Sequence, residues 1–139
     1  MVLVVFLLGL IGTGIELLFL GHTVGLSQLI PLVLMVMTLL VLGWHAIERK
    51  SASLRAFQIT MLLVVGAGLL GGALHFQFNW DFEREGEPTM SRMKVFSKAL
   101  TGAAPSLAPG AMIQLGLLGL VYTFRHPAFE RQTQTREQL

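Results

Sequence analysis

Four blocks of apolar residues, separated by short polar segments, dominate the chain. These blocks cover approximately residues 2–20, 30–46, 57–76 and 107–124. A helix needs roughly 20 apolar residues to cross the hydrocarbon core of a bilayer. Because backbone N–H and C=O groups in lipid have no water to bind, each block is predicted to be helical. The pattern therefore predicts an all-α fold, an integral membrane four-helix bundle, as a single domain over residues 1–139.

The longest polar segment, residues 77–106, joins the third and fourth blocks and is predicted to be a loop outside the membrane. Aromatic residues at its start, including Trp80, are typical of a belt at the level of the lipid headgroups. Farther on, Met93, Phe96 and Leu100 recur at helical spacing. This spacing predicts a short amphipathic helix on the outer surface that tethers the third and fourth spans. A lid or docking surface for a partner is the alternative role.

Basic residues predict the orientation of the chain. The loop between the second and third blocks contains Arg49, Lys50 and Arg55, and residues 125–139 contain three further arginines. The loop between the first two blocks has no Lys or Arg. The positive-inside rule therefore places both termini, with the tail 125–139, in the cytoplasm. We expect a multi-pass protein of the bacterial inner membrane, with a retained first span rather than a cleaved signal peptide.

The composition agrees with a membrane protein and excludes several functions. Hydrophobic residues make up 53% of the chain and charged residues 13%, whereas charged residues make up roughly 25% of a soluble domain. The formal net charge of +2 gives no reason to expect a nucleic-acid partner. Without cysteine, disulfides and thiolate metal sites are excluded. Because no nucleotide-binding or hydrolase motif is present, we expect no enzymatic activity.

A carboxylic acid, Glu16, lies inside the first apolar block. An ionisable group within a span costs at least about 2.5 kcal/mol on insertion scales, so it normally faces protein rather than lipid. Helical spacing places Gly9, Gly12 and Thr13 on the same side as Glu16. Small residues allow another helix to approach closely, so Glu16 is predicted to lie on a packing seam.

The third block has a similar stripe of glycines that ends at His75. Gln114 in the fourth block and His22 after the first block lie toward the same side of the predicted membrane. We therefore expect an intramembrane polar cluster of Glu16, Gln114, His75 and His22, provided that the first, third and fourth spans are neighbours. Three roles are open for Glu16: a structural acid, a proton, cation or quinone-headgroup site, or a pairing group for another subunit.

Each apolar block ends close to one histidine. His22 and His75 are predicted near the outer side, and His45 and His126 near the inner side. Two histidines at one level are suitable axial ligands for a haem iron, and one histidine is a suitable ligand for a chlorophyll magnesium. Alternatively, all four are interfacial residues at the ends of spans. Zinc held by Glu16, His22 and His75 lacks the spacing of a known motif, so no metal site is predicted. Bound lipid is expected.

Two stretches, IELLFLGH and GAAPSLAPGAMIQLGLLGLVYTFRHP, resemble a group of small bacterial four-span membrane proteins. The resemblance covers most of the chain and implies the four-span arrangement, but it transfers no reaction, ligand or catalytic residue.

The hypothesis for function is a non-catalytic accessory subunit of a larger membrane complex, most plausibly a photosynthetic or respiratory assembly. Its partners would be the bilayer and other membrane subunits. One alternative is a redox protein that binds haem, pigment or quinone. A further alternative is a small proton- or cation-coupled transporter that acts through Glu16.

Overall fold

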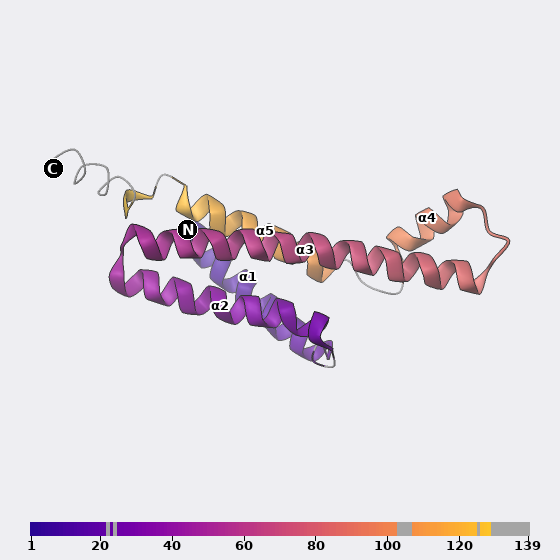
Figure 1. Ribbon diagram of the computed structural model, residues 1–139, viewed down its shortest axis with the longest axis horizontal. Helices are drawn as coiled ribbons and strands as arrows, with labels where there is room; N and C mark the ends of the chain where they lie inside the picture. Colours follow the sequence, from indigo (N-terminus) through magenta and orange to yellow (C-terminus); the bar gives the residue numbers. More distant parts are fainter. Residues whose placement is uncertain (22, 24, 103–106, 125, 129–139) are drawn as a thin grey trace.

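The computed structural model describes the chain except for residues 22, 24, 103–106, 125 and 129–139. The described residues form five helices (Figure 1): α1 (Val2–Phe19), α2 (Leu26–Glu48), α3 (Ser51–Gly86), α4 (Arg92–Leu100) and α5 (Leu107–Thr123). They contain no strand, so the predicted all-α class is confirmed.

Three of the four predicted spans are helices long and apolar enough to cross a membrane, namely α1, α2 and α3. The fourth, α5, is apolar but has only 17 residues. At a rise of 1.5 Å per residue it is roughly 26 Å long, shorter than a hydrocarbon core of about 30 Å. The helix lengths are therefore those of a membrane protein, while a fourth crossing by α5 remains a prediction.

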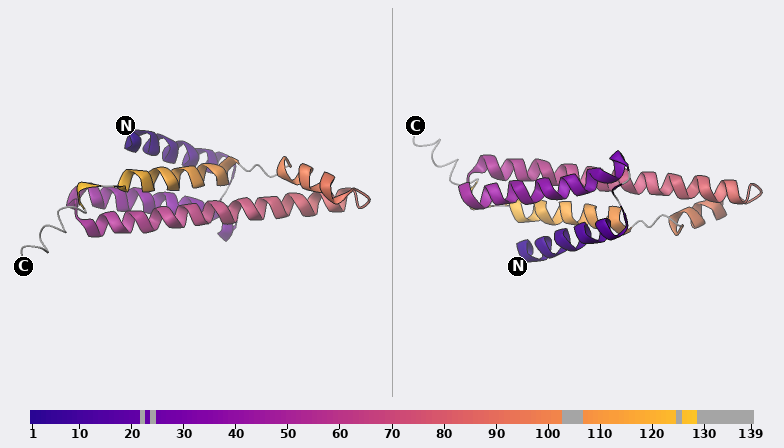
Figure 2. Two further views of the ribbon diagram at one scale, coloured as in Figure 1. Left: turned by 90° about the horizontal axis from the view of Figure 1, so that it is seen from above. Right: turned by 90° about the horizontal axis from the view of Figure 1, so that it is seen from below.

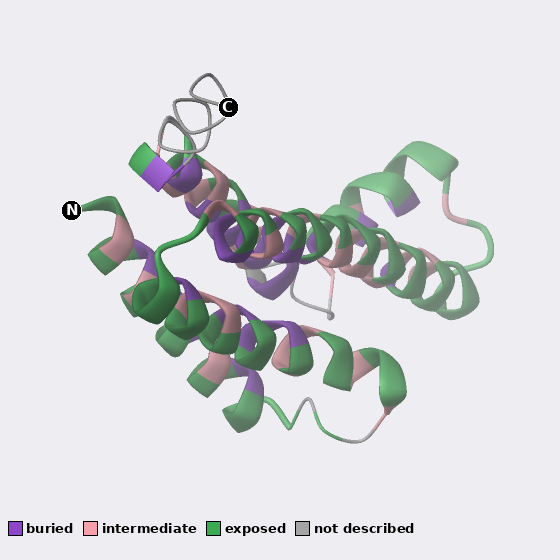
Figure 3. Cartoon of the chain, turned by 60° about the vertical axis from the view of Figure 1, so that its left-hand side comes forward, coloured by how far each residue is buried: buried purple, intermediate pink, exposed green. Residues whose placement is uncertain are grey.

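Much of the outside of these helices is exposed (Figure 3), and many of the exposed residues have large apolar side chains. Leu8 of α1 is 68% exposed, Leu40 of α2 is 67% exposed and Leu69 of α3 is 60% exposed. Soluble monomers rarely expose large continuous apolar areas. The exposed surfaces of α1, α2 and α3 are thus suited to contact with lipid chains.

Helix α3 packs against α5 on one side and α2 on another, and α1 packs mainly against α5. Glycines make the α3–α5 contact close. A Cβ atom on Gly116 would lie 2.9 Å from the carbonyl oxygen of Met61, and one on Gly68 would lie 2.8 Å from that of Pro109. The glycine stripe predicted on the third span is therefore a real packing seam.

Aromatic rings fill the centre of the structure. Phe6 of α1 is fully buried and meets Phe57 of α3 edge to face, with ring centroids 5.8 Å apart. Phe57 meets Tyr122 of α5 in the same manner at 6.1 Å. These contacts join α1, α3 and α5, which together with α2 are called the helical body below.

Helix α3 is much longer than the predicted third span. Its 36 residues extend roughly 54 Å, so its last turns project beyond the helical body (Figure 2). Helix α4 folds back on this projection and forms a helical hairpin with it. Asn79 Nδ2 donates a hydrogen bond to the carbonyl of Ala99 at 3.1 Å, and Lys98 lies 3.2 Å from Glu83. Residues 77–102, from the end of the predicted span to Gly102 behind α4, are called the hairpin.

The hairpin corrects the predicted outer loop. Residues 77–86 continue α3 as an unbroken helix, and the predicted short helix is α4, which packs against α3. Val95 and Ala99 of α4 are buried, whereas Met93, Phe96 and Leu100 are exposed. Contact of this exposed apolar stripe with a membrane surface stays a prediction.

Candidate functional sites

Glu16 lies on an exposed face of α1. The side of α1 that packs inward carries Thr13 and Leu17, both buried. Gly12 is exposed, and a Cβ atom placed on it would meet nothing within 4 Å. Of the small residues in the predicted seam of α1, Gly9 contacts α5, because its Cβ would lie 2.8 Å from Leu115. The contact with α5 therefore stops short of Gly12 and Glu16.

Two other members of the predicted polar cluster, Gln114 and His75, lie among the described residues. Gln114 of α5 is exposed, His75 of α3 is partly buried beside a cavity, and His22 lies outside the described residues. Neither Glu16 nor Gln114 lines the cavity beside His75. Although α1 contacts α5 and α5 contacts α3, the structure does not gather these side chains around one cavity.

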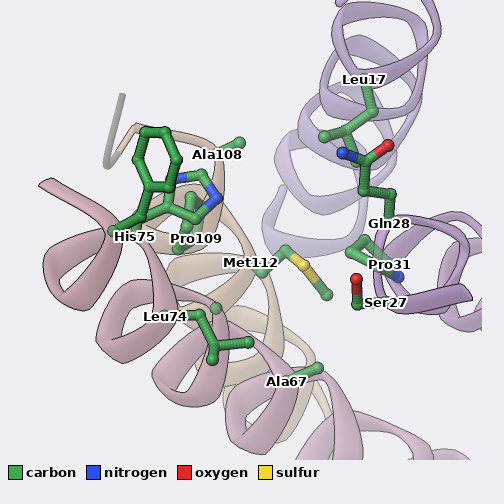
Figure 4. A pocket seen from close by; sticks show the side chains of 12 residues that line it. Leu17, Ser27, Gln28, Pro31, Ala67, Leu74, His75, Ala108, Pro109 and Met112 are labelled. Carbon is green, nitrogen blue, oxygen red and sulfur yellow. The ribbon is translucent and has the colours of Figure 1, made fainter. Parts of the chain in front are cut away.

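The cavity beside His75, called the His75 cavity, has a volume of about 380 Å³ and is lined by residues of α1, α2, α3 and α5. It lies at the end of the helical body nearer the hairpin. His75 and Pro109 lie on one side, and Gln28 and Ser27 lie across from them (Figure 4). The remaining walls are apolar, with Met112 between the two sides.

Such a cavity is suited to an apolar molecule with a polar headgroup. Ligand sites are typically apolar with a few polar groups that fix the orientation of the ligand. An imidazole and a carboxamide on opposite walls are able to hydrogen bond two oxygen atoms of one headgroup. Sequence reasoning identified His75 but not Gln28, because Gln28 lies just before the apolar block and its role depends on how α2 packs.

A second cluster lies at the opposite end of the helical body, where α2 and α5 end and α3 begins. His45 of α2 is buried, and its ring centroid lies 5.2 Å from that of His126. His45 Nδ1 is 2.9 Å from Ser53 Oγ, and that hydroxyl donates to the carbonyl of Lys50. Since the hydroxyl hydrogen is used in that bond, His45 Nδ1–H is the donor to Ser53.

The two rings are arranged edge to face, with an angle of 72° between their planes. Axial ligands lie on opposite faces of a haem, whereas these rings contact each other directly. The prediction that His45 and His126 lie at one level thus agrees with the structure, but their present geometry is not that of a haem clamp. In the part of the chain that the structure describes, no group of three or more His, Asp or Glu residues is placed to hold a metal ion.

These features define a class: an all-helical protein with long apolar helices, a mostly apolar cavity that carries a few polar groups, and a helical hairpin beyond the helical body. Comparisons with protein families, with curated proteins and with solved structures found no match to the chain.

Proposed function

We propose that the protein is a non-catalytic accessory subunit of a larger membrane complex, and that α1 joins it to a partner subunit. A bioenergetic assembly, photosynthetic or respiratory, in the bacterial inner membrane is the host we favour. In this proposal α5 forms a fourth crossing, and both termini lie in the cytoplasm because basic residues flank that side.

The exposed position of Glu16 is the observation that carries the proposal. The acid lies on α1 beside exposed apolar residues such as Ile15 and Leu18. If this face met lipid, the carboxyl group would be desolvated, which costs about 2.5–3.5 kcal/mol for a charged residue at the centre of a span. A partner helix with a hydrogen-bond donor removes this cost. Gly12, one turn before Glu16, has open space around it and allows such a helix to approach closely.

The hairpin provides a second surface for a partner. Phe78 and Phe82 stack with ring centroids 6.4 Å apart and are both more than half exposed. Met93 of α4 is 77% exposed. Exposed aromatic and methionine side chains are enriched at protein interfaces. The α1 face around Glu16 and the exposed surface of the hairpin lie toward the same end of the molecule, so one partner is able to contact both.

The first experiment is to extract the tagged protein from its native membrane in mild detergent, and to measure its mass and subunit content. Stoichiometric co-elution with larger membrane proteins is expected. Glu16→Leu should release the partner while leaving the isolated protein folded, because Leu suits an exposed apolar face. Gln114→Leu, which removes an exposed polar group from α5, is the matched control and should keep the partner. Elution of the wild type as a lone monomer or homo-oligomer would overturn the proposal.

The His75 cavity supports a second candidate function, the binding of a quinone or a similar lipid with a carbonyl headgroup. Extraction of the purified protein with organic solvent and mass spectrometry of the extract tests this function. A stoichiometric quinone that is lost in both His75→Leu and Gln28→Leu would support it. An extract without quinone would reject it. The transporter alternative has no comparable support, since Glu16 lines neither the His75 cavity nor the cavity beside His45.

A further inference from the structure

A second cavity, of about 370 Å³, opens at the end of the helical body away from the hairpin. Its polar lining comes from two helix ends and the residues that follow them: His45 and Arg49 at the end of α2, and Tyr122 and His126 at the end of α5. Its other lining residues are two alanines and a proline, so among the residues that the structure describes no acidic side chain lines it. This cavity is called the His45 cavity.

Arg49 has an unusual backbone conformation. It caps the C-terminus of α2 with a φ of 51°, and it is the one non-glycine residue with a positive φ in the described part of the chain. Glycine or asparagine normally fills such a position, because a side chain there is sterically penalised. Strained residues tend to cluster at functional sites, so Arg49 is a candidate binding residue.

Hydrogen bonds fix what each histidine offers to a ligand. The backbone N–H of Ala128 donates to His126 Nδ1 at 3.3 Å, so a neutral His126 carries its hydrogen on Nε2 and is a donor there. The Nδ1–H of His45 is already bound to Ser53. Its Nε2 therefore carries a lone pair when the ring is neutral and becomes a second donor when the ring is protonated. His45 is 4% exposed, so its orientation is held by its surroundings.

The charges favour an anion over a cation. The nearest acid along the chain, Glu48, lies 3.7 Å from Lys50 and does not line the cavity. The guanidinium of Arg49 matches the oxygen atoms of a phosphate in a forked geometry, and imidazole and phenol groups add single hydrogen bonds. The cavity also lies where apolar helices end, which is the level at which phospholipid phosphates are found.

We propose that the His45 cavity binds a phosphate group. Arg49, His126 and Tyr122 are its direct ligands, and the buried ring of His45 lines the same cavity. Two sources share this chemistry: the headgroup of an anionic phospholipid and a soluble phosphate. The proposal is independent of any partner at Glu16, because the two places lie toward opposite ends of the helical body.

A purely structural explanation exists for the same residues. Cations at helix C-termini interact favourably with the helix dipole, and Arg49 is at such an end. Arg49→Gly separates the two explanations. Glycine suits the positive φ of this position, so the fold should keep or gain stability while the phosphate ligand is lost. Arg55→Gln is the matched control. It removes one charge at an exposed position in the first turns of α3, outside the cavity.

The test uses delipidated full-length protein in detergent. Native mass spectrometry counts bound phosphatidylglycerol, with dioleoylglycerol, which has no phosphate, as the comparison lipid. Phosphorus NMR line broadening measures the binding of inorganic phosphate. Wild type and Arg55→Gln should retain phosphatidylglycerol over dioleoylglycerol, and Arg49→Gly should lose at least about tenfold in affinity, as expected for a charge-assisted hydrogen bond.

Binding of phosphatidylglycerol that depends on Arg49 would identify a lipid headgroup as the ligand. Binding of inorganic phosphate alone, again dependent on Arg49, would identify a soluble phosphate and would also support the site. The proposal is overturned if the wild type binds neither probe, if Arg49→Gly binds as tightly as the wild type, or if Arg55→Gln loses as much affinity as Arg49→Gly. Thermal unfolding of each variant shows whether any loss of affinity arises from unfolding.

Discussion

Asn79 and Ala99 tie the two helices of the hairpin together: the buried side chain of Asn79 donates a hydrogen bond to the carbonyl of Ala99 at 3.1 Å. Gly102 makes room for this side chain, since a Cβ atom there would lie 2.7 Å from Asn79 Cγ. The fold of the hairpin thus depends on a polar side chain in α3 and a glycine just after α4.

We predict that Asn79→Ala loosens α4 without unfolding the helical body. The carbonyl of Ala99 would lose a buried partner, at a cost of about 1–3 kcal/mol. Hydrogen exchange should become faster for the amides of α4 and remain unchanged for those of α5. Gln77→Ala, at an exposed position of the same helix, is the control. Unchanged protection of α4 in Asn79→Ala would show that the hydrogen bond does not hold the hairpin.

Gly116→Ala should weaken the contact between α3 and α5. The added methyl group would lie 2.5 Å from Val65 Cγ2 and 2.9 Å from the carbonyl oxygen of Met61, so the helices must separate. Overpacking of this kind typically costs about 1–3 kcal/mol. Gly66→Ala, where a Cβ meets nothing within 4 Å, should be neutral or slightly stabilising. The free energy of unfolding in mixed micelles is measured for both variants. Equal stability of Gly116→Ala and Gly66→Ala would contradict the close packing of α3 and α5.

Removal of the buried Phe6 ring should lower the stability of the fold. Phe6→Ala deletes a fully buried side chain that contacts Phe57, and about 3–5 kcal/mol of stability is expected to be lost. Phe19→Ala, in the last turn of α1, removes a ring that is 87% exposed and should change little. The midpoint of thermal unfolding in detergent is the readout. A similar midpoint for both variants would mean that Phe6 is not part of the core.

Ala67→Phe should displace any apolar ligand from the His75 cavity. Ala67 lines the cavity, and a phenyl ring added there would fill part of its volume. Ala73→Phe adds the same ring at an exposed position of α3 and is the control. The amount of quinone or lipid that copurifies, measured per protein, should fall several-fold in Ala67→Phe only. An equal amount in both variants would show that the ligand is bound elsewhere.

The helical class and the long spans were predictable because lipid leaves the backbone of an apolar segment no alternative to helix. The glycine seam of α3 followed from helical spacing. Helical spacing did not predict where the packing seam on α1 ends. Gly12 and Thr13 are neighbours on the helix surface, and only the packing of α1 against the other helices decides that Thr13 is buried while Gly12 and Glu16 are exposed.

The hairpin was missed for a related reason. Spacing predicted the short helix α4 and its apolar stripe, but not that α4 would pack against α3 and bury Val95 and Ala99. The level shared by His45 and His126 followed from the positions of both residues at span ends. The contact between their rings, and the inclusion of Arg49 in the same cavity, depend on tertiary packing that no local pattern encodes.

The length of α3 has a mechanical consequence. One unbroken helix runs from the His45 end, through the helical body, to the tip of the hairpin (Figure 2). Membrane helices adjust to the thickness of the surrounding bilayer by tilting. Because α3 continues as one helix into the hairpin, a small tilt of α3 within a membrane would move the tip of the hairpin farther than the part of α3 in the helical body. A partner seated on the hairpin would therefore be moved by a change in bilayer thickness without contacting the bilayer itself.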